Sequence, residues 1–430
     1  MKNNDIFVLH LSDLHIRNEA KTKGYFVYSN ALKNLITDIK KQTESKDKII
    51  LVVSGDIVDQ GNYVAHMETA IKFFEKLKEQ LSDKVIEIII VPGNHDKVRS
   101  NVNSLVSLAH SINGLNQREK IEDEWDVHLE SYKMYFELTK KIYEIFKIDK
   151  EATNTFGVEL VNIENVNICF ICIDSAWCSF SKNDYRKLRV GEYQLLKLRD
   201  EYKNLKDTLE ARNQCIDLTI AVSHFPLNWL EATEEKMCND YFLSDNFLDV
   251  DILMCGHVHN FSVVNYFNHR HSLLTLVTGI GWGLTEPNED TQQNHRYSIY
   301  SLNLFYNSCD ILMRKTKNNG DFDYDYSIYA GEHEVRDNKL RYPLKVKETN
   351  AFIRANSKDP VNSKSLFIDN NLLKRIPVIS NAIAVFSTSI SEIQNKYKQD
   401  FVEKIIDSKM MEYRTNDIPT EKKKRISKKY

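Results

Sequence analysis

The stretch Ile49–Asp59 reads IILVVSGDIVD, an apolar and largely β-branched run that ends in a glycine and two aspartates. The same pattern occurs in IFVLHLSDLH at residues 6–15 and in VIEIIIVPGNHD at residues 85–96. Runs that are apolar throughout are typical of strands buried on both faces. Helical apolar spacing lies between them, at residues 28–41 and 66–81. The sequence therefore predicts an α/β fold with a partly parallel sheet.

Later parts of the chain repeat the pattern. A helix is expected to begin at Gly191, and further apolar runs predict strands at residues 166–173, 218–222, 251–254, 273–278, 297–304 and 309–314. In sheets of this kind, functional residues gather at the carboxyl ends of the strands. We therefore predict one site at this edge, formed by five polar clusters: Asp13 to His15, Gly55 to Asp59, Gly93 to Asp96, His224, and Gly256 to His259.

Composition limits the class of protein. The chain has 430 residues and a formal net charge of -3, which argues against a basic nucleic-acid binder and against a disordered chain. We find no secretory signal pattern and no run of about 18 apolar residues, so we expect no membrane span. The 7 cysteines lack a framework spacing, which favours free thiols and a cytoplasmic location. Cys169 and Cys172 lie three apart on a predicted strand and should point to opposite faces.

The length predicts a large domain, which we expect to carry the predicted site, and a smaller piece. We place the catalytic domain at residues 1–330, with a helical, aromatic-rich insertion at about 100–150. Those aromatics are more typical of a helix core than of a stacking surface. Residues 331–430 read as a linker, a long helix at 380–409 and a basic tail. The apolar stripe of that helix predicts a packing partner, either the catalytic domain, a second copy of the chain or a partner protein.

The five clusters share one chemistry. Carboxylate, imidazole and amide oxygens are ligands for divalent ions such as Mn²⁺, Fe and Zn²⁺. A single histidine after a strand is more often structural than a metal ligand. Five such clusters, each placed at the end of a predicted strand, are not expected by accident, and together they indicate a metal centre. A pair of ions about 3.5–4 Å apart also needs a bridging carboxylate, and the clusters offer several.

Taken together, the patterns DxH, GDxxD, GNHD, H and GHxH over residues 5–315 resemble the calcineurin-like metallophosphoesterase superfamily. The resemblance implies a layered α/β/β/α sandwich, here with the helical insertion and a C-terminal helical extension. It also implies two divalent ions, with Mn²⁺ expected and Fe or Zn²⁺ as alternatives. In the implied ligand map Asp56 bridges both ions, the first ion is completed by Asp13, His15 and His259, and the second by Asn94, His224 and His257.

The resemblance implies hydrolysis of a phosphoester by a metal-bridging hydroxide. His95 would lie beside the ions without binding them and protonate the leaving group. Asp96 is expected to orient His95, and Asp59 to be structural or to support the ligands. The glycines at 55, 93 and 256 would let the backbone turn tightly beside the ions. His10, His269 and His271 are expected to be structural or exposed.

Gln60 separates branches of the superfamily. Protein Ser/Thr phosphatases carry an arginine in GDxVDRG, and arginine grips a dianionic phosphate through two parallel hydrogen bonds. Gln60 cannot supply that charge. We therefore expect a phosphodiesterase or nuclease-type enzyme that acts on a nucleotide or nucleic acid. The alternatives are a phosphomonoesterase or protein phosphatase, and a non-catalytic binding subunit that acts through its C-terminal helix.

Overall fold

The protein is described from a computed structural model. The structure describes residues 6–18, 25–98, 125–126, 128–164, 166–179, 183–258, 262–267, 272–278, 296–304, 307–317, 321–325 and 339–344. The side chains of residues 25–31 and 265–267 are not described. All of these lie within Met1–Ala351, the first of two units into which the chain divides. The predicted boundary near residue 330, the helix at 380–409 and the basic tail fall outside the described residues and stay predictions.

The first sheet has 7 strands, in the order β12-β11-β10-β1-β2-β3, with β13 paired to β11. Its parallel part pairs β1 with β2 and β2 with β3. The remaining pairs are antiparallel. The strands are β1 (Ile6–Leu11), β2 (Ile49–Ser54), β3 (Val85–Val91), β10 (Arg296–Asn303), β11 (Ser308–Thr316), β12 (Phe322–Tyr324) and β13 (Leu340–Pro343).

The second sheet has 6 strands, in the order β4-β5-β6-β7-β9-β8. The central strands are parallel, and β4 and β8 close the edges as antiparallel strands. The strands are β4 (Gly157–Ile163), β5 (Val166–Ile173), β6 (Leu218–Ser223), β7 (Ile252–Cys255), β8 (Ser262–Phe267) and β9 (Ser272–Val277). The sequence therefore builds two mixed sheets, with the parallel strands at the β3 edge of the first sheet and at the centre of the second.

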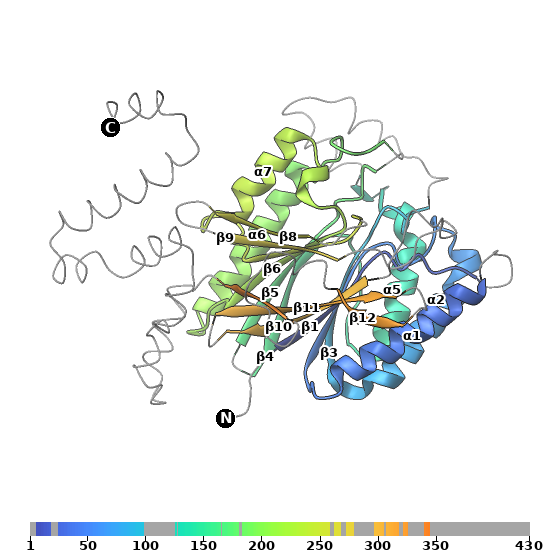
Figure 1. The fold of residues 1–430 in the computed structure, drawn as a ribbon. Coiled ribbons are helices and arrows are strands. Elements are labelled where there is room, and N and C mark those ends of the chain that lie inside the picture. The colour runs from blue at the N-terminus through green and yellow to red at the C-terminus, as the bar shows by residue number, and fades with distance from the viewer. Residues whose placement is uncertain are drawn as a thin grey trace, which may run out of the picture. The chain divides into compact units, whose positions relative to one another are not determined.

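Helices cover the outer face of each sheet, as Figure 1 shows. The first sheet carries α1 (Tyr25–Thr43), α2 (Tyr63–Leu81) and α5 (Lys133–Phe146), and the second carries α6 (Glu192–Glu210) and α7 (Ala232–Phe242). Short 3-10 turns lie at η2 (Ser82–Lys84), η3 (Glu130–Tyr132) and η4 (Leu227–Trp229). The result is the layered α/β/β/α sandwich that the resemblance implied.

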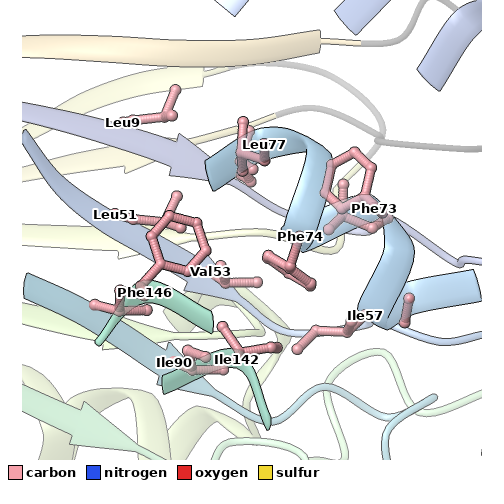
Figure 2. Close-up of a cluster of buried hydrophobic side chains, with 14 of the residues drawn as sticks. Leu9, Leu51, Val53, Ile57, Phe73, Phe74, Leu77, Ile90, Ile142 and Phe146 are labelled. Carbon is pink, nitrogen blue, oxygen red and sulfur yellow. The ribbon is translucent and has the colours of Figure 1, made fainter. Parts of the chain in front are cut away.

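Alternation along the strands explains the layers. In β1, Leu9 belongs to the outer core under the helices, whereas Val8 belongs to the inner core between the sheets. Figure 2 shows the outer core, where α2 lays Phe73 and Phe74 over the strands of the first sheet. Because successive strand residues point to opposite faces, a strand that is apolar throughout contributes side chains to both the outer and the inner core.

Each predicted strand is present, with its ends shifted by no more than two residues. Cys169 and Cys172 belong to different cores on opposite faces of β5, as predicted. The aromatics of α5 and its approach pack into the outer core, so the helix-core interpretation of the insertion is confirmed for residues 128–150. Residues 99–124 and 127 of that insertion lie outside the described part.

Sequence reasoning missed β4, β8, β12, β13 and α7. The edge strand β4 mixes exposed and buried residues, and its polar Glu159 and Asn162 hide the apolar alternation. α7 reads ATEEKMCNDYF, with few apolar positions to reveal its buried face. Among the described residues, no helix combines the length and apolarity needed to cross a bilayer.

Candidate metal centre

The polar clusters follow strands of both sheets. Asp13, Asp56 and Asn94 come after β1, β2 and β3 of the first sheet, and His224 and His257 come after β6 and β7 of the second. The loop after β1 is bound to the loop after β2, because the N–H groups of Asp13 and His15 donate to the carbonyls of Gly55 and Asp56. The backbone N–H of His257 donates to the Asp13 carboxylate at 2.9 Å and joins the two sheets.

Asp56 lies at the middle of the cluster and is 1% exposed. Its Oδ2 atom is 3.6 Å from His15 Nε2 and 3.4 Å from His224 Nε2. Its Oδ1 atom accepts the backbone N–H of His95 at 2.7 Å. One carboxylate oxygen thus lies between two imidazoles that come from different sheets.

The His224 ring shows what the cluster requires. Its Nδ1 is 2.8 Å from the carbonyl oxygen of Ser54, which can only accept, so Nδ1 carries the hydrogen. Its Nε2 then faces Asn94 Oδ1 at 3.1 Å and His257 Nδ1 at 3.2 Å, besides Asp56. A convergence of acceptor atoms with little solvent needs a cation at its centre.

Electrostatics point the same way. Burial favours the neutral ring of His224, but the Asp56 carboxylate outweighs it and raises the pKa of His224 to about 9. Burial also opposes ionisation of Asp56, yet His224 and His95 outweigh it and hold the pKa of Asp56 well below its usual range. The pocket therefore favours a positive charge, which a proton or a metal ion can supply.

The donor atoms fall into two groups that share Asp56. Asp13, Asp56, His224 and His257 offer ligand atoms within 4.8 Å of one another, and so do His15, Asp56 and His95. Asp13 is held by Ser12, whose hydroxyl donates to Oδ2 at 2.6 Å. Oxygen and nitrogen donors that share one carboxylate fit a pair of divalent ions. The structure therefore brings together every predicted ligand except His259, which lies outside the described residues.

Backbone strain marks the same residues. Asp13, His15, Asp56 and His257 all have positive φ angles, of 54°, 41°, 56° and 64°. Such conformations cost of order 1–3 kcal/mol each in non-glycine residues, and they persist only where the surroundings enforce them. A Cβ added to Gly93 would overlap the Asp56 carboxylate, so that glycine is required by close approach.

The surroundings of His95 differ from the prediction. Its Nδ1 lies 3.3 Å from Asp59 Oδ1 and accepts the Gln60 N–H at 3.0 Å. Asp59 in turn lies 3.0 Å from Arg17 Nε. Asp96, the expected partner, uses its two oxygens to accept backbone N–H groups of Asp56, Ile57 and Gly93. Asp96 therefore ties the loops after β2 and β3 together, and the carboxylate beside the His95 ring is that of Asp59.

His10 belongs to the support of the site. It is 0% exposed, and its ring lies 2.8 Å from Ser54 Oγ and 2.9 Å from Thr278 Oγ1. Burial lowers the pKa of His10 to about 3, so the ring is neutral. This agrees with the expected structural role. His269 and His271 lie outside the described residues.

Comparison with known proteins identifies the fold family. The family model for calcineurin-like phosphoesterases matches residues 7–261. An uncharacterised protein, R555 of Acanthamoeba polyphaga mimivirus, is 23% identical over 262 residues, which are 60% of this chain and 15% of that protein. This chain thus spans a small fraction of that relative.

The chain is also similar to solved structures at low sequence identity. Vps29 of Chaetomium thermophilum is 11% identical with a TM-score of 0.30, over 79% of this chain and 100% of that one. GAP50, the anchor in the inner membrane complex of Plasmodium, is 16% identical with a TM-score of 0.37, over 80% of this chain and 89% of that one.

Proposed function

This chain belongs to the calcineurin-like phosphoesterase family, and we propose that within it the protein is a metal-dependent phosphodiesterase that acts on a nucleotide or nucleic acid. The observation that carries the proposal is Asp56 Oδ2, which lies between His15 and His224 as a bridging ligand must. The complete set of described ligands supports an enzyme over a binding subunit that has lost turnover.

In the proposed ligand map Asp56 would be shared by two divalent ions. One would be held by Asp13, His15 and His259, and the other by Asn94, His224 and His257. When bound, two divalent ions activate water near neutral pH and neutralise charge on the phosphate. The chain's own part is to hold these donors in place, through the strained loops and the hydrogen bonds of Ser12 and Asp96.

His95 is the proposed proton donor to the leaving oxygen. It is part of the loop after β3, and its ring meets the His15 ring edge-on at 4.5 Å. We assign its orientation to Asp59, which Arg17 holds from the other side. A positioned acid of this kind contributes about 10²–10⁴-fold to a reaction rate.

Removal of the metal tests the proposal directly. Dialysis against a chelator should abolish hydrolysis, and Mn²⁺ should restore it best among divalent ions, because the ligands are oxygen and nitrogen atoms without thiolate. The measurement is the rate on bis-p-nitrophenyl phosphate before and after each addition. Full activity in the dialysed protein with excess chelator would show that the site works without metal.

The proposed substrate class predicts a preference for diesters. Gln60 is exposed and follows Asp59, and a neutral amide cannot offset the second negative charge of a monoester. The kcat/KM for bis-p-nitrophenyl phosphate should exceed that for p-nitrophenyl phosphate, and Gln60→Arg should narrow the gap. A tenfold preference for the monoester, about 1.4 kcal/mol of transition-state binding, would favour a phosphomonoesterase instead.

Two proposals rest on the sequence alone. The cytoplasmic location follows from the free cysteines. Self-association or partner binding through residues 380–409 follows from their apolar stripe, and light scattering of the chain with and without residues 366–430 tests it.

A further inference from the structure

A row of aromatic rings leads away from the metal ligand His257. The Trp229 ring lies 4.2 Å from the His257 ring at 85°. The Tyr185 ring lies 5.3 Å from the Trp229 ring at 84°. Phe225 backs the row, 4.1 Å from His257 and almost fully buried. The rings therefore connect the proposed reaction centre to the protein surface.

The outer end of the row is open to solvent. Tyr185 is 55% exposed, and it is the single aromatic among the large hydrophobic residues that are exposed in the described part of the chain. An aromatic that packs only to stabilise a loop gains most when it is covered. A tyrosine that is more than half exposed at the end of a row of rings leading to a metal ligand is instead suited to be a contact surface with an apolar body and a polar tip.

Backbone hydrogen bonds hold the two segments of the row together. The N–H of Arg186 donates to the Trp229 carbonyl at 2.9 Å, and the N–H of Glu231 donates to the Leu188 carbonyl at 2.8 Å. Leu188 and Leu230 form a parallel bridge between the segments. The two backbone segments that carry the rings are thus held together before any ligand arrives, which lowers the cost of ordering the site.

The cation next to Tyr185 in the sequence is already engaged by other groups of the protein. Arg186 is paired with Glu235 and also donates to the Leu230 carbonyl. The chain as a whole has a formal net charge of -3. Binding of long nucleic acids depends on many unpaired cations, whereas a ring platform needs none. The surface therefore suits one flat ring attached to the scissile phosphate.

We propose that Tyr185 and Trp229 form a stacking site for the base of a nucleoside that is esterified to the scissile phosphate. This inference rests on the proposed phosphodiesterase function and narrows its substrate class to nucleotide diesters. Stacking of a base on an aromatic side chain tolerates any base, because every base has a flat π-face. The site would thus select nucleosides without selecting among them.

The kinetic test compares two substrates that share the same leaving group. Thymidine 5′-(p-nitrophenyl phosphate) carries a base, and methyl p-nitrophenyl phosphate carries none. Tyr185→Ala should lower kcat/KM for the thymidine ester by at least about fivefold, the factor that corresponds to about 1 kcal/mol of lost stacking, mainly through KM. The methyl ester should change by less than twofold. Tyr185→Phe keeps the ring and should behave like the unchanged protein.

A binding test separates this inference from the proposed function. The affinity for thymidine 5′-monophosphate, measured by quenching of tryptophan fluorescence, should fall at least about fivefold in Tyr185→Ala. The affinity for inorganic phosphate should not change. Equal losses for both esters, or no loss for either, would overturn the stacking site. If the unchanged protein hydrolyses no diester, the proposed function fails, and the thymidine monophosphate titration alone then decides whether the stacking site exists.

Discussion

Replacing Asp56 by asparagine is expected to abolish turnover and to release both metal ions. The substitution keeps the shape of the side chain and one oxygen, but it removes the negative charge that allows two cations to lie close together. The Oδ2 atom of Asp56 lies 3.6 Å from His15 Nε2 and 3.4 Å from His224 Nε2. An amide nitrogen in the place of this oxygen would face these ligands as a hydrogen-bond donor. Bound metal supplies several kcal/mol of transition-state stabilisation, so the rate should fall by at least about 10³-fold.

Elemental analysis of the purified variant, together with its rate on bis-p-nitrophenyl phosphate, measures both effects. Asp59→Asn is the matched control, because Asp59 is a neighbouring carboxylate that lies beside His95 and is not a proposed ligand. It should retain two metal equivalents. Two equivalents in Asp56→Asn as well would show that Asp56 does not bridge the ions.

The convergence of the polar clusters could be predicted because of where the strands end, whereas the ligand map came from the resemblance to a family. Asp13, Asp56 and His224 each follow an apolar run directly, and parallel strands bring such residues to a common edge. The partition into two sheets was not predictable in the same way. It depends on β10 pairing antiparallel with β1, far along the chain, and local periodicity contains no information about that pairing.

The carboxylate beside His95 shows a second limit. Asp96 adjoins His95 in sequence, so adjacency favoured it as the orienting group. The chain turns after β3 so that the Asp96 carboxylate points back to the amides of Asp56 and Gly93. Asp59, which follows a different strand, lies beside the ring instead. The backbone path through a tight loop decided the partner, and single-residue patterns do not encode that path.

The stacking row was missed for a related reason. Tyr185 and Trp229 are 44 positions apart in a chain that has 21 tyrosines and 4 tryptophans, and neither belongs to one of the five polar clusters. Sequence reasoning instead considered a stacking surface among the aromatics of residues 100–150. Those that the structure describes belong to the two outer cores or pack against them. The aromatics of residues 100–150 differ from Tyr185 and Trp229 in how deeply they are buried, and burial cannot be read directly from the sequence.

Replacing His95 by alanine is expected to leave both metal ions in place while turnover falls by about 10²–10⁴-fold, the range typical for loss of a positioned acid. The loss should depend on the leaving group. A p-nitrophenolate leaves without much help from a proton, so the loss should be small for a nitrophenyl diester and large for an alkyl diester. Asp59→Asn should show the same pattern to a lesser degree, since it alters only the orientation of the ring.

The competing interpretation is that His95 binds metal, since its ring lies within reach of His15 and Asp56. Metal content separates the two roles, and the leaving-group series confirms the result independently. If His95→Ala loses one metal equivalent, or if the rate falls equally for nitrophenyl and alkyl diesters, His95 is a ligand and the proton must come from elsewhere. If metal is retained and the loss grows with the basicity of the leaving oxygen, His95 acts as the acid and Asp59 as the group that positions it.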